Sequence, residues 1–167
     1  GVEGASPSFP QLRMPDVPPP DKCIPIDRII EHPIRLREQW ETRSAMTPEL
    51  TQDTIGQQRQ EADLSWWIRP AEPTATGTPL IVAISDALPP PVFSITPQIR
   101  FVPTIDLTVH IRAELSTIDW PAAEWVLVRF VTRHVSNGYL EEDGQIWLRD
   151  GALLGMSRQL SVAKQLN

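Results

Sequence analysis

The 167-residue chain has only one cysteine, Cys23, and it has fewer basic than acidic residues. A single cysteine excludes an internal disulfide framework and fits a reducing compartment. The formal net charge is −6. This acidic balance argues against binding to nucleic acids or anionic membranes, because both attract basic patches.

Long apolar runs are also missing from the sequence. No stretch approaches the roughly 18 apolar residues of a transmembrane helix, and the first residues lack the basic-then-apolar order of a signal peptide. There is no histidine or cysteine pattern with metal-ligand spacing and no glycine-rich phosphate loop. We therefore expect a soluble cytoplasmic protein without a membrane span, a metal or another cofactor.

Proline is abundant and unevenly distributed. Seven of the 18 prolines lie within the first 25 residues. Stretches of this composition are typical of extended spacers. We therefore predict a proline-rich linker over residues 1–24 and one folded domain over residues 25–167, a length that can bury a real core.

Within the predicted domain, the pattern indicates one helix between strands. Residues 26–41 read as an irregular edge strand, 44–62 as a loop, and 63–70 as an aromatic strand. An apolar helix should follow, capped by Thr78 and ended by the prolines at 89–91.

Four alternating strands come next, beginning with "FVPTIDLTVHIRA" and ending with "ALLGMSRQLSVA". Asn137-Gly138 and Asp150-Gly151 predict tight turns between them, and Asp143-Gly144 predicts a bulge or kink. The order favours an α+β fold in which a curved antiparallel sheet wraps around one central helix.

Three polar residues occupy positions that look buried: Asp86 in the apolar helix, Thr104 early in an alternating strand, and Gln159 in the last strand. Each has an ordinary explanation, since Asp86 can cap the helix, threonine suits strands, and Gln159 can bond a backbone edge. If the three converge, a carboxylate, a hydroxyl and an amide can hold one water molecule. The carboxylate would take the proton of that water, which is general-base catalysis without a covalent nucleophile.

The segments "ISDALPPP", "VPTIDLTVHIRA" and "EWVLVRFVTRHVSNGYLEEDGQIWLRDGALLGMSRQL" resemble the C-terminal half of TesB-like acyl-CoA thioesterases, the type II double-hotdog family. The resemblance implies a hotdog fold and hydrolysis of an acyl-CoA thioester to the free acid and CoA. It assigns the catalytic water to Asp86, Thr104 and Gln159. It also implies a second hotdog domain as partner, upstream in the same protein or in another subunit.

Two other functions fit the same layout. A hotdog domain can act as a biosynthetic dehydratase, lyase or cyclase, with Asp106 and His110 as acid and base, or it can be a non-catalytic dimerisation domain. The stretch between Asp86 and Thr104 is short and proline-rich compared with the bacterial enzymes of the family. The acyl-chain preference of the family therefore cannot be transferred to this chain.

Overall fold

The computed structural model describes residues 12–26, 38–46, 61–96 and 99–165. The predicted edge strand and loop lie largely in 27–37 and 47–60, outside the described residues. The helices are η1 Pro20–Lys22, α2 Thr78–Ile84, η4 Pro91–Ser94 and η5 Leu115–Thr117. The strands are β1 Ile24–Pro25, β2 Trp40–Ser44, β3 Ala62–Pro70, β4 Ile99–Phe101, β5 Thr104–Ile111, β6 Val126–Thr132, β7 Val135–Ser136, β8 Tyr139–Leu148, β9 Leu153–Val162 and β10 Lys164–Gln165.

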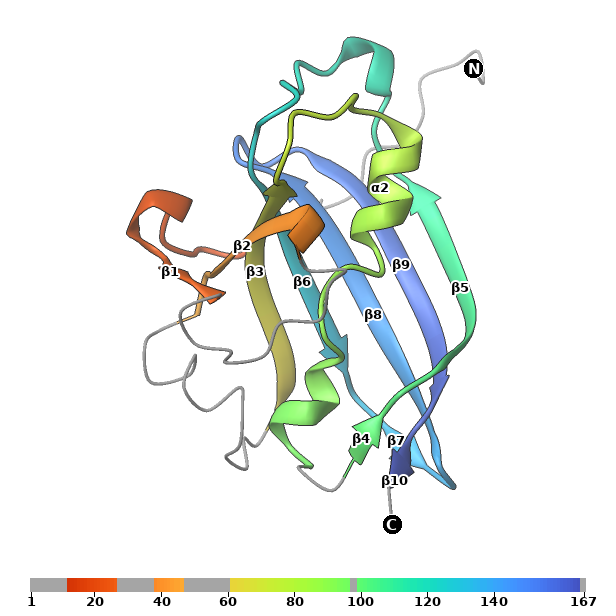
Figure 1. The fold of residues 1–167 in the computed structure, drawn as a ribbon. Helices are drawn as coiled ribbons and strands as arrows, with labels where there is room; N and C mark the ends of the chain where they lie inside the picture. The colour runs from red at the N-terminus through yellow and green to blue at the C-terminus, as the bar shows by residue number, and fades with distance from the viewer. Residues whose placement is uncertain (1–11, 27–37, 47–60, 97–98, 166–167) are drawn as a thin grey trace.

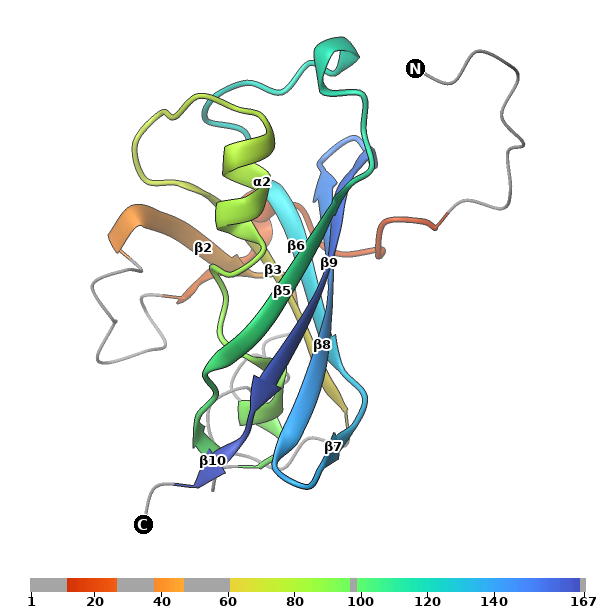
Figure 2. The same cartoon turned by 90° about the vertical axis from the view of Figure 1, so that its right-hand side faces the viewer.

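One antiparallel sheet dominates the structure, with the strand order β1-β2-β3-β6-β8-β9-β5 and β7 paired to β8. The short strands β4 and β10 pair separately. Helix α2 lies across one face of the sheet (Figure 1), and the view turned by 90° shows it on a single side (Figure 2). We call this side the inner face and the opposite side the outer face. The predicted α+β layout is confirmed.

Helix α2 is shorter than its apolar pattern suggested. Gly77 precedes it with a φ of 134°, and the helix ends at Ile84. Thr78 is therefore the first helical residue, and the prediction that it caps the helix is wrong. Asp86 follows the helix instead of lying within it, and its side chain is exposed. Because the helix ends well before the prolines at 89–91, Asp86 lies outside its apolar contacts.

The main core lies between α2 and the inner face. It joins Leu80, Ile81 and Ile84 of the helix to apolar side chains of β3, β6 and β8, among them Trp66 and Phe130. Full burial of side chains of this size stabilises the fold by about 1.5–3 kcal/mol each.

Gly155 of β9 permits the close approach of the helix to this core. A Cβ atom at this position would lie 2.9 Å from Cγ2 of Ile81, which is closer than real Cβ contacts. The absence of a side chain at residue 155 therefore sets how deeply α2 packs onto the sheet.

The outer face carries a second apolar cluster that includes Cys23, Trp67, Trp125, Leu127 and Trp147. Residues of the proline-rich segment, notably Met14 and Val17, pack against it.

Backbone carbonyls of the proline-rich segment also bind the sheet. Nε1 of Trp67 donates a hydrogen bond to the carbonyl of Pro18 at 2.9 Å, and Nη1 of Arg43 donates one to Pro20 at 2.9 Å. Proline carbonyls remain free to accept because they have no strand partner. Spacer composition does not anticipate this packing of residues 12–26, and the boundary at residue 24 stays a prediction.

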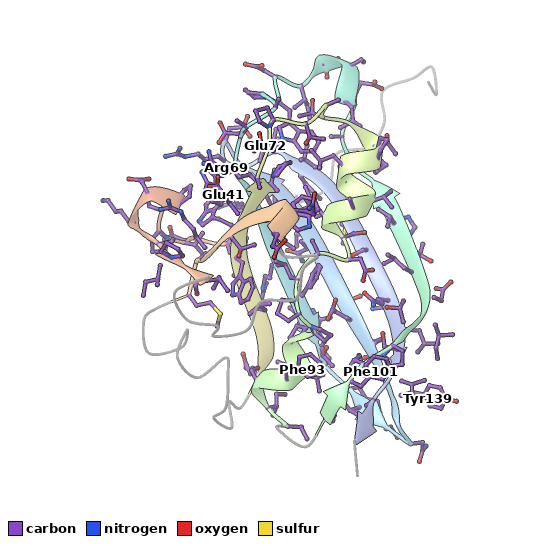
Figure 3. All side chains as sticks on the ribbon, in the orientation of Figure 1. Glu41, Arg69, Glu72, Phe93, Phe101 and Tyr139 are labelled. Atoms are coloured by element: carbon purple, nitrogen blue, oxygen red, sulfur yellow. The ribbon has the colours of Figure 1, made fainter. Side chains whose placement is uncertain are left out.

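Charged side chains flank Trp125 in the outer cluster. Arg69 of β3 pairs with Glu41 of β2 at 2.7 Å, and Figure 3 labels both side chains. The guanidinium groups of Arg43 and Arg69 also lie over the ring of Trp125, 5.3 and 4.6 Å from its centroid. Stacking of this kind contributes about 0.5–1 kcal/mol at exposed sites.

The tight turns are where the sequence places them. Asn137 and Gly138 have positive φ angles of 51° and 78°, as a type I′ hairpin requires, and Gly151 has a φ of 94°. The predicted irregularity at Asp143-Gly144 is wrong, because both residues pair in register with β6 and β9. The register of β8 with β9 shifts between Ile146 and Trp147, where β9 carries one extra residue, Leu154.

Among the residues that the structure describes, no helix is long and apolar enough to span a membrane.

Candidate active site

Strand β9 presents two different faces. Gly155 contacts α2, so Ser157, Gln159 and Ser161 share the inner face with it. All three are buried. Arg158 points outward and pairs with Asp143 of β8 at 2.7 Å. Arg158 and Gln159 thus point to opposite faces, as the alternation of side chains along a strand requires.

A β-bulge turns Thr104 toward the inner face. The register of β5 with β9 shifts between Thr104 and Asp106, so that Thr104 lies opposite Ser161 while Asp106 lies opposite Leu160. Directly opposed residues of an antiparallel pair share a face. Simple alternation would have put Thr104 on the same face as Asp106 and His110. The bulge separates them, because it inserts one extra residue on β5.

Thr104 and Gln159 are brought into direct contact. Nε2 of Gln159 donates a hydrogen bond to Oγ1 of Thr104. Gln159 is 7% exposed, whereas Thr104 is exposed despite its buried-looking sequence position. The pair therefore forms a polar contact at the rim of the inner face, where it is open to one side.

Asp86 approaches the same region from the C-terminal end of α2. The chain leaves the helix over the middle of the sheet, on the inner side (Figure 1). The Asp86 charge is close enough to raise the pKa of Glu142, the β8 residue directly opposite Gln159. Thr104 and Gln159 are thus joined directly, whereas Asp86 is linked to this region through its effect on Glu142, and no hydrogen bond joins Asp86 to the other two within the described residues.

Glu142 is a site residue that the sequence analysis missed. Its side chain is 5% exposed. Burial, followed by the negative charge of Asp86, raises the pKa of Glu142 to about 8. A carboxyl with this pKa is mostly neutral at pH 7. The run "YLEEDGQ" concealed it, because three consecutive acids usually indicate a solvated strand, and strand alternation alone could have picked out Glu142.

Thr132 of β6 extends the polar surface across the sheet. It follows Val131, which pairs with Asp143, and its Oγ1 atom is buried without a hydrogen-bond partner among the described residues. We call Thr132, Glu142, Gln159 and Thr104 the polar row, because they cross β6, β8, β9 and β5 in that order. Buried polar atoms are expensive to leave unpaired, so the free Thr132 hydroxyl and the buried Glu142 make this row a candidate binding surface for a polar molecule.

The alternative acid-base pair lies elsewhere. Asp106 is opposite Leu160 and His110 is opposite Met156, so both belong to the outer face. Both side chains are exposed. Since the outer side of β5 does not face α2, this pair does not share a site with the polar row.

In the described part of the chain, no group of three or more His, Cys, Asp and Glu residues is arranged to hold a metal ion. Burial also raises the pKa of the Cys23 thiol, which keeps that side chain in its less nucleophilic form.

Solved structures with the same fold identify the architecture. A hotdog-fold protein of unknown function from Alicyclobacillus acidocaldarius aligns with a TM-score of 0.80 and 23% identity, over 100% of this chain and 60% of its own. A putative thioesterase II from Thermobifida fusca aligns with a TM-score of 0.75 and 22% identity, over 98% of this chain and 59% of its own.

A third structure, the acyl-CoA thioesterase II TesB2 from Mycobacterium marinum, aligns with a TM-score of 0.62 and 18% identity, over 98% of this chain and 60% of its own. The chain thus spans about three-fifths of the length of these proteins. Curated proteins give no match. The predicted hotdog fold is confirmed.

The acyl-CoA thioesterase C-terminal domain family matches residues 20–163, which is most of the chain. The match begins inside the proline-rich segment and ends just after β9. The chain therefore belongs to the acyl-CoA thioesterase C-terminal domain family.

Proposed function

We propose that the protein hydrolyses an acyl-CoA thioester through a water molecule held by Asp86, Thr104 and Gln159. The observation that carries the proposal is the hydrogen bond from Gln159 to Thr104, together with the effect of Asp86 on Glu142, the residue opposite Gln159. Gln159 and Thr104 belong to strands that meet only in the tertiary structure, and family membership supports the proposed reaction class.

The proposed reaction needs no covalent intermediate. The carboxylate of Asp86 takes a proton from the water while the water oxygen bonds to the thioester carbon. Gln159 and Thr104 orient the water, which converts a collision into a positioned attack. The tetrahedral adduct then expels the CoA thiolate, breaking the C–S bond, and the thiolate takes up the proton that Asp86 received.

A second hotdog domain is proposed as the partner. Asp86 and Thr104 are exposed, so the site is open on one side, and β5 ends the order of the described sheet. Apolar side chains lie at this edge, with Ile105 55% exposed and Ile111 37% exposed. Pairing of β5 with another hotdog domain would cover this edge and the open side of the site.

Sedimentation of the 167-residue chain tests the partner. We expect a dimer that Ile105→Asp converts to a monomer, because a charge in the paired edge disfavours association. A wild-type chain that stays monomeric at micromolar concentrations would contradict pairing of two copies of this chain through the β5 edge.

Release of CoA from a panel of acyl-CoAs tests the function. We expect hydrolysis by the wild-type protein and a strong loss with Asp86→Asn, Thr104→Val and Gln159→Leu. Asp106→Asn is the matched control, because it changes a carboxylate on the outer side of the same strand as Thr104. Absence of CoA release across the panel would contradict the proposed reaction, and full activity of Asp86→Asn would contradict the proposed base.

A further inference from the structure

Glu142 occupies a place that the proposed reaction does not explain. It is paired with Gln159 across β8 and β9, so its side chain leaves the sheet next to the amide that is proposed to hold the water. It is more than nine-tenths buried. Its carboxyl group has no hydrogen-bond partner within the described residues. A carboxylate buried in this way is costly, and the neutral acid is therefore the stable form.

Among the described residues, the neighbours of Glu142 across the sheet carry no charge. Gln159 of β9 lies directly opposite it, and Thr132 of β6 follows the residue that pairs with Asp143. The described residues of η4 are likewise uncharged. Asp86 is the charged group that acts on Glu142, and its sign opposes ionisation.

The acidic neighbours of Glu142 in sequence do not share its environment. Glu141 and Asp143 point to the outer face, where Arg158 and Arg133 hold Asp143 in ion pairs. The positive charges of this region are thus engaged on the far side of the sheet. Glu142 is the acid of the three that is turned toward Asp86.

We propose that Glu142 is a positioning residue that acts through Asp86 and keeps the water site at a single negative charge. The inference rests on the proposed function. At neutral pH the neutral acid of Glu142 adds no charge to the site, so the carboxylate of Asp86 is the one proposed base. The proton of Glu142 is not transferred in the reaction.

Ionisation of Glu142 would place a second negative charge beside the site. The attack of water creates a negatively charged tetrahedral adduct, and an additional negative charge nearby opposes its formation. Hydrolysis should therefore fall as Glu142 loses its proton, at a pH close to the value of about 8 that burial and Asp86 give to its pKa.

The pH profile of CoA release tests this role. We expect kcat of the wild-type protein to fall about tenfold per pH unit above the pKa of Glu142, and the ratio of kcat at pH 9 to kcat at pH 7 to be about tenfold higher in Glu142→Gln. Chromatographic detection of CoA avoids a pH-dependent reagent. Glu141→Gln, a change on the other face of the same strand, should keep the wild-type profile. An unchanged upper limb in Glu142→Gln would overturn the inference.

A titration by NMR separates this inference from the proposed reaction. With ¹³C-labelled glutamate, we expect one carboxyl to titrate near pH 8, to vanish in Glu142→Gln, and to move to lower pH in Asp86→Asn. Titration of Glu142 in the ordinary range, or no response to Asp86→Asn, would overturn the inference even if CoA is released. The expected titration without any CoA release would instead overturn the proposed reaction.

Discussion

The inner face of the sheet has two halves that differ in chemistry. Under α2, Gly155 lies against Ile81, and Ile146 belongs to the same apolar core as Ile81 and Ile84. Beyond the end of the helix, the same strands carry the polar row. Helix α2 stops at Ile84, and beyond it Leu140 of β8 packs with Val92 and Ile99 in a smaller apolar cluster. The same face of one sheet thus packs against a short helix in one half and carries the candidate site in the other.

The largest expected effect is the loss of CoA release after a substitution in the polar half of the inner face. Asp86→Asn should lower the rate of CoA release by about 10²–10⁴-fold, because the amide cannot accept the proton of water. The free energy of unfolding should change little, since Asp86 is exposed and follows the helix. Acyl-CoA turnover and urea unfolding measure the two quantities. A loss of stability that parallels the loss of activity would show that Asp86 has a structural role.

The next effect concerns the pH dependence of stability. The pKa of Glu142 is about 8 in the folded protein, against an ordinary value of 4.5. Between these values the folded chain holds a proton that the unfolded chain has released, so stability falls as pH rises through this window and is flat above it. Glu142→Gln should remove this slope, gaining about 3 kcal/mol on wild type between pH 5.5 and pH 8.5.

Urea unfolding at the two pH values measures this gain. Glu141→Gln is the control, because its side chain lies on the outer face and should leave the slope in place. Parallel curves for wild type and Glu142→Gln would show that Glu142 is not a buried neutral acid.

One added methyl group should disturb the packing of α2 in the apolar half and lower the stability of the protein. Gly155→Ala places a Cβ atom against Cγ2 of Ile81, and overpacking of this kind costs about 1–3 kcal/mol. Ser157→Ala, two residues along the same face, should cost less than about 1 kcal/mol, because a Cβ atom already fills that space. Equal losses in thermal or urea unfolding would argue against close packing of α2 on β9.

The smallest effects on stability are expected from a reciprocal exchange of valine and threonine on β6. Val128 lies in the apolar core, and Thr132 carries the unpartnered hydroxyl of the polar row. Val128→Thr buries a hydroxyl among apolar groups and should cost about 2 kcal/mol. Thr132→Val should change stability by less than about 1 kcal/mol in either direction. Similar losses in urea unfolding would show that both positions belong to one uniform core.

Part of the candidate site was predictable from alternation. Gln159 faces inward and Arg158 outward, as a period of two requires. The position of Thr104 was not predictable in this way, because the bulge at Thr104–Asp106 inverts the face of the residues before it. The environment of Asp86 also escaped prediction, since the end of α2 depends on where the chain must turn away from the sheet.

The sequence by itself determined the order of the helix and the long strands and the tight turns at Asn137-Gly138 and Gly151, because these depend on local backbone preferences and on hydrophobic periodicity. The hotdog class followed from the resemblance of its segments to a known family. The tertiary structure alone decided that Glu142 is buried opposite Gln159 and that Thr104 meets Gln159. The reason is physical: ionisation and hydrogen bonding depend on what surrounds a side chain, and strands distant in the sequence supply those surroundings.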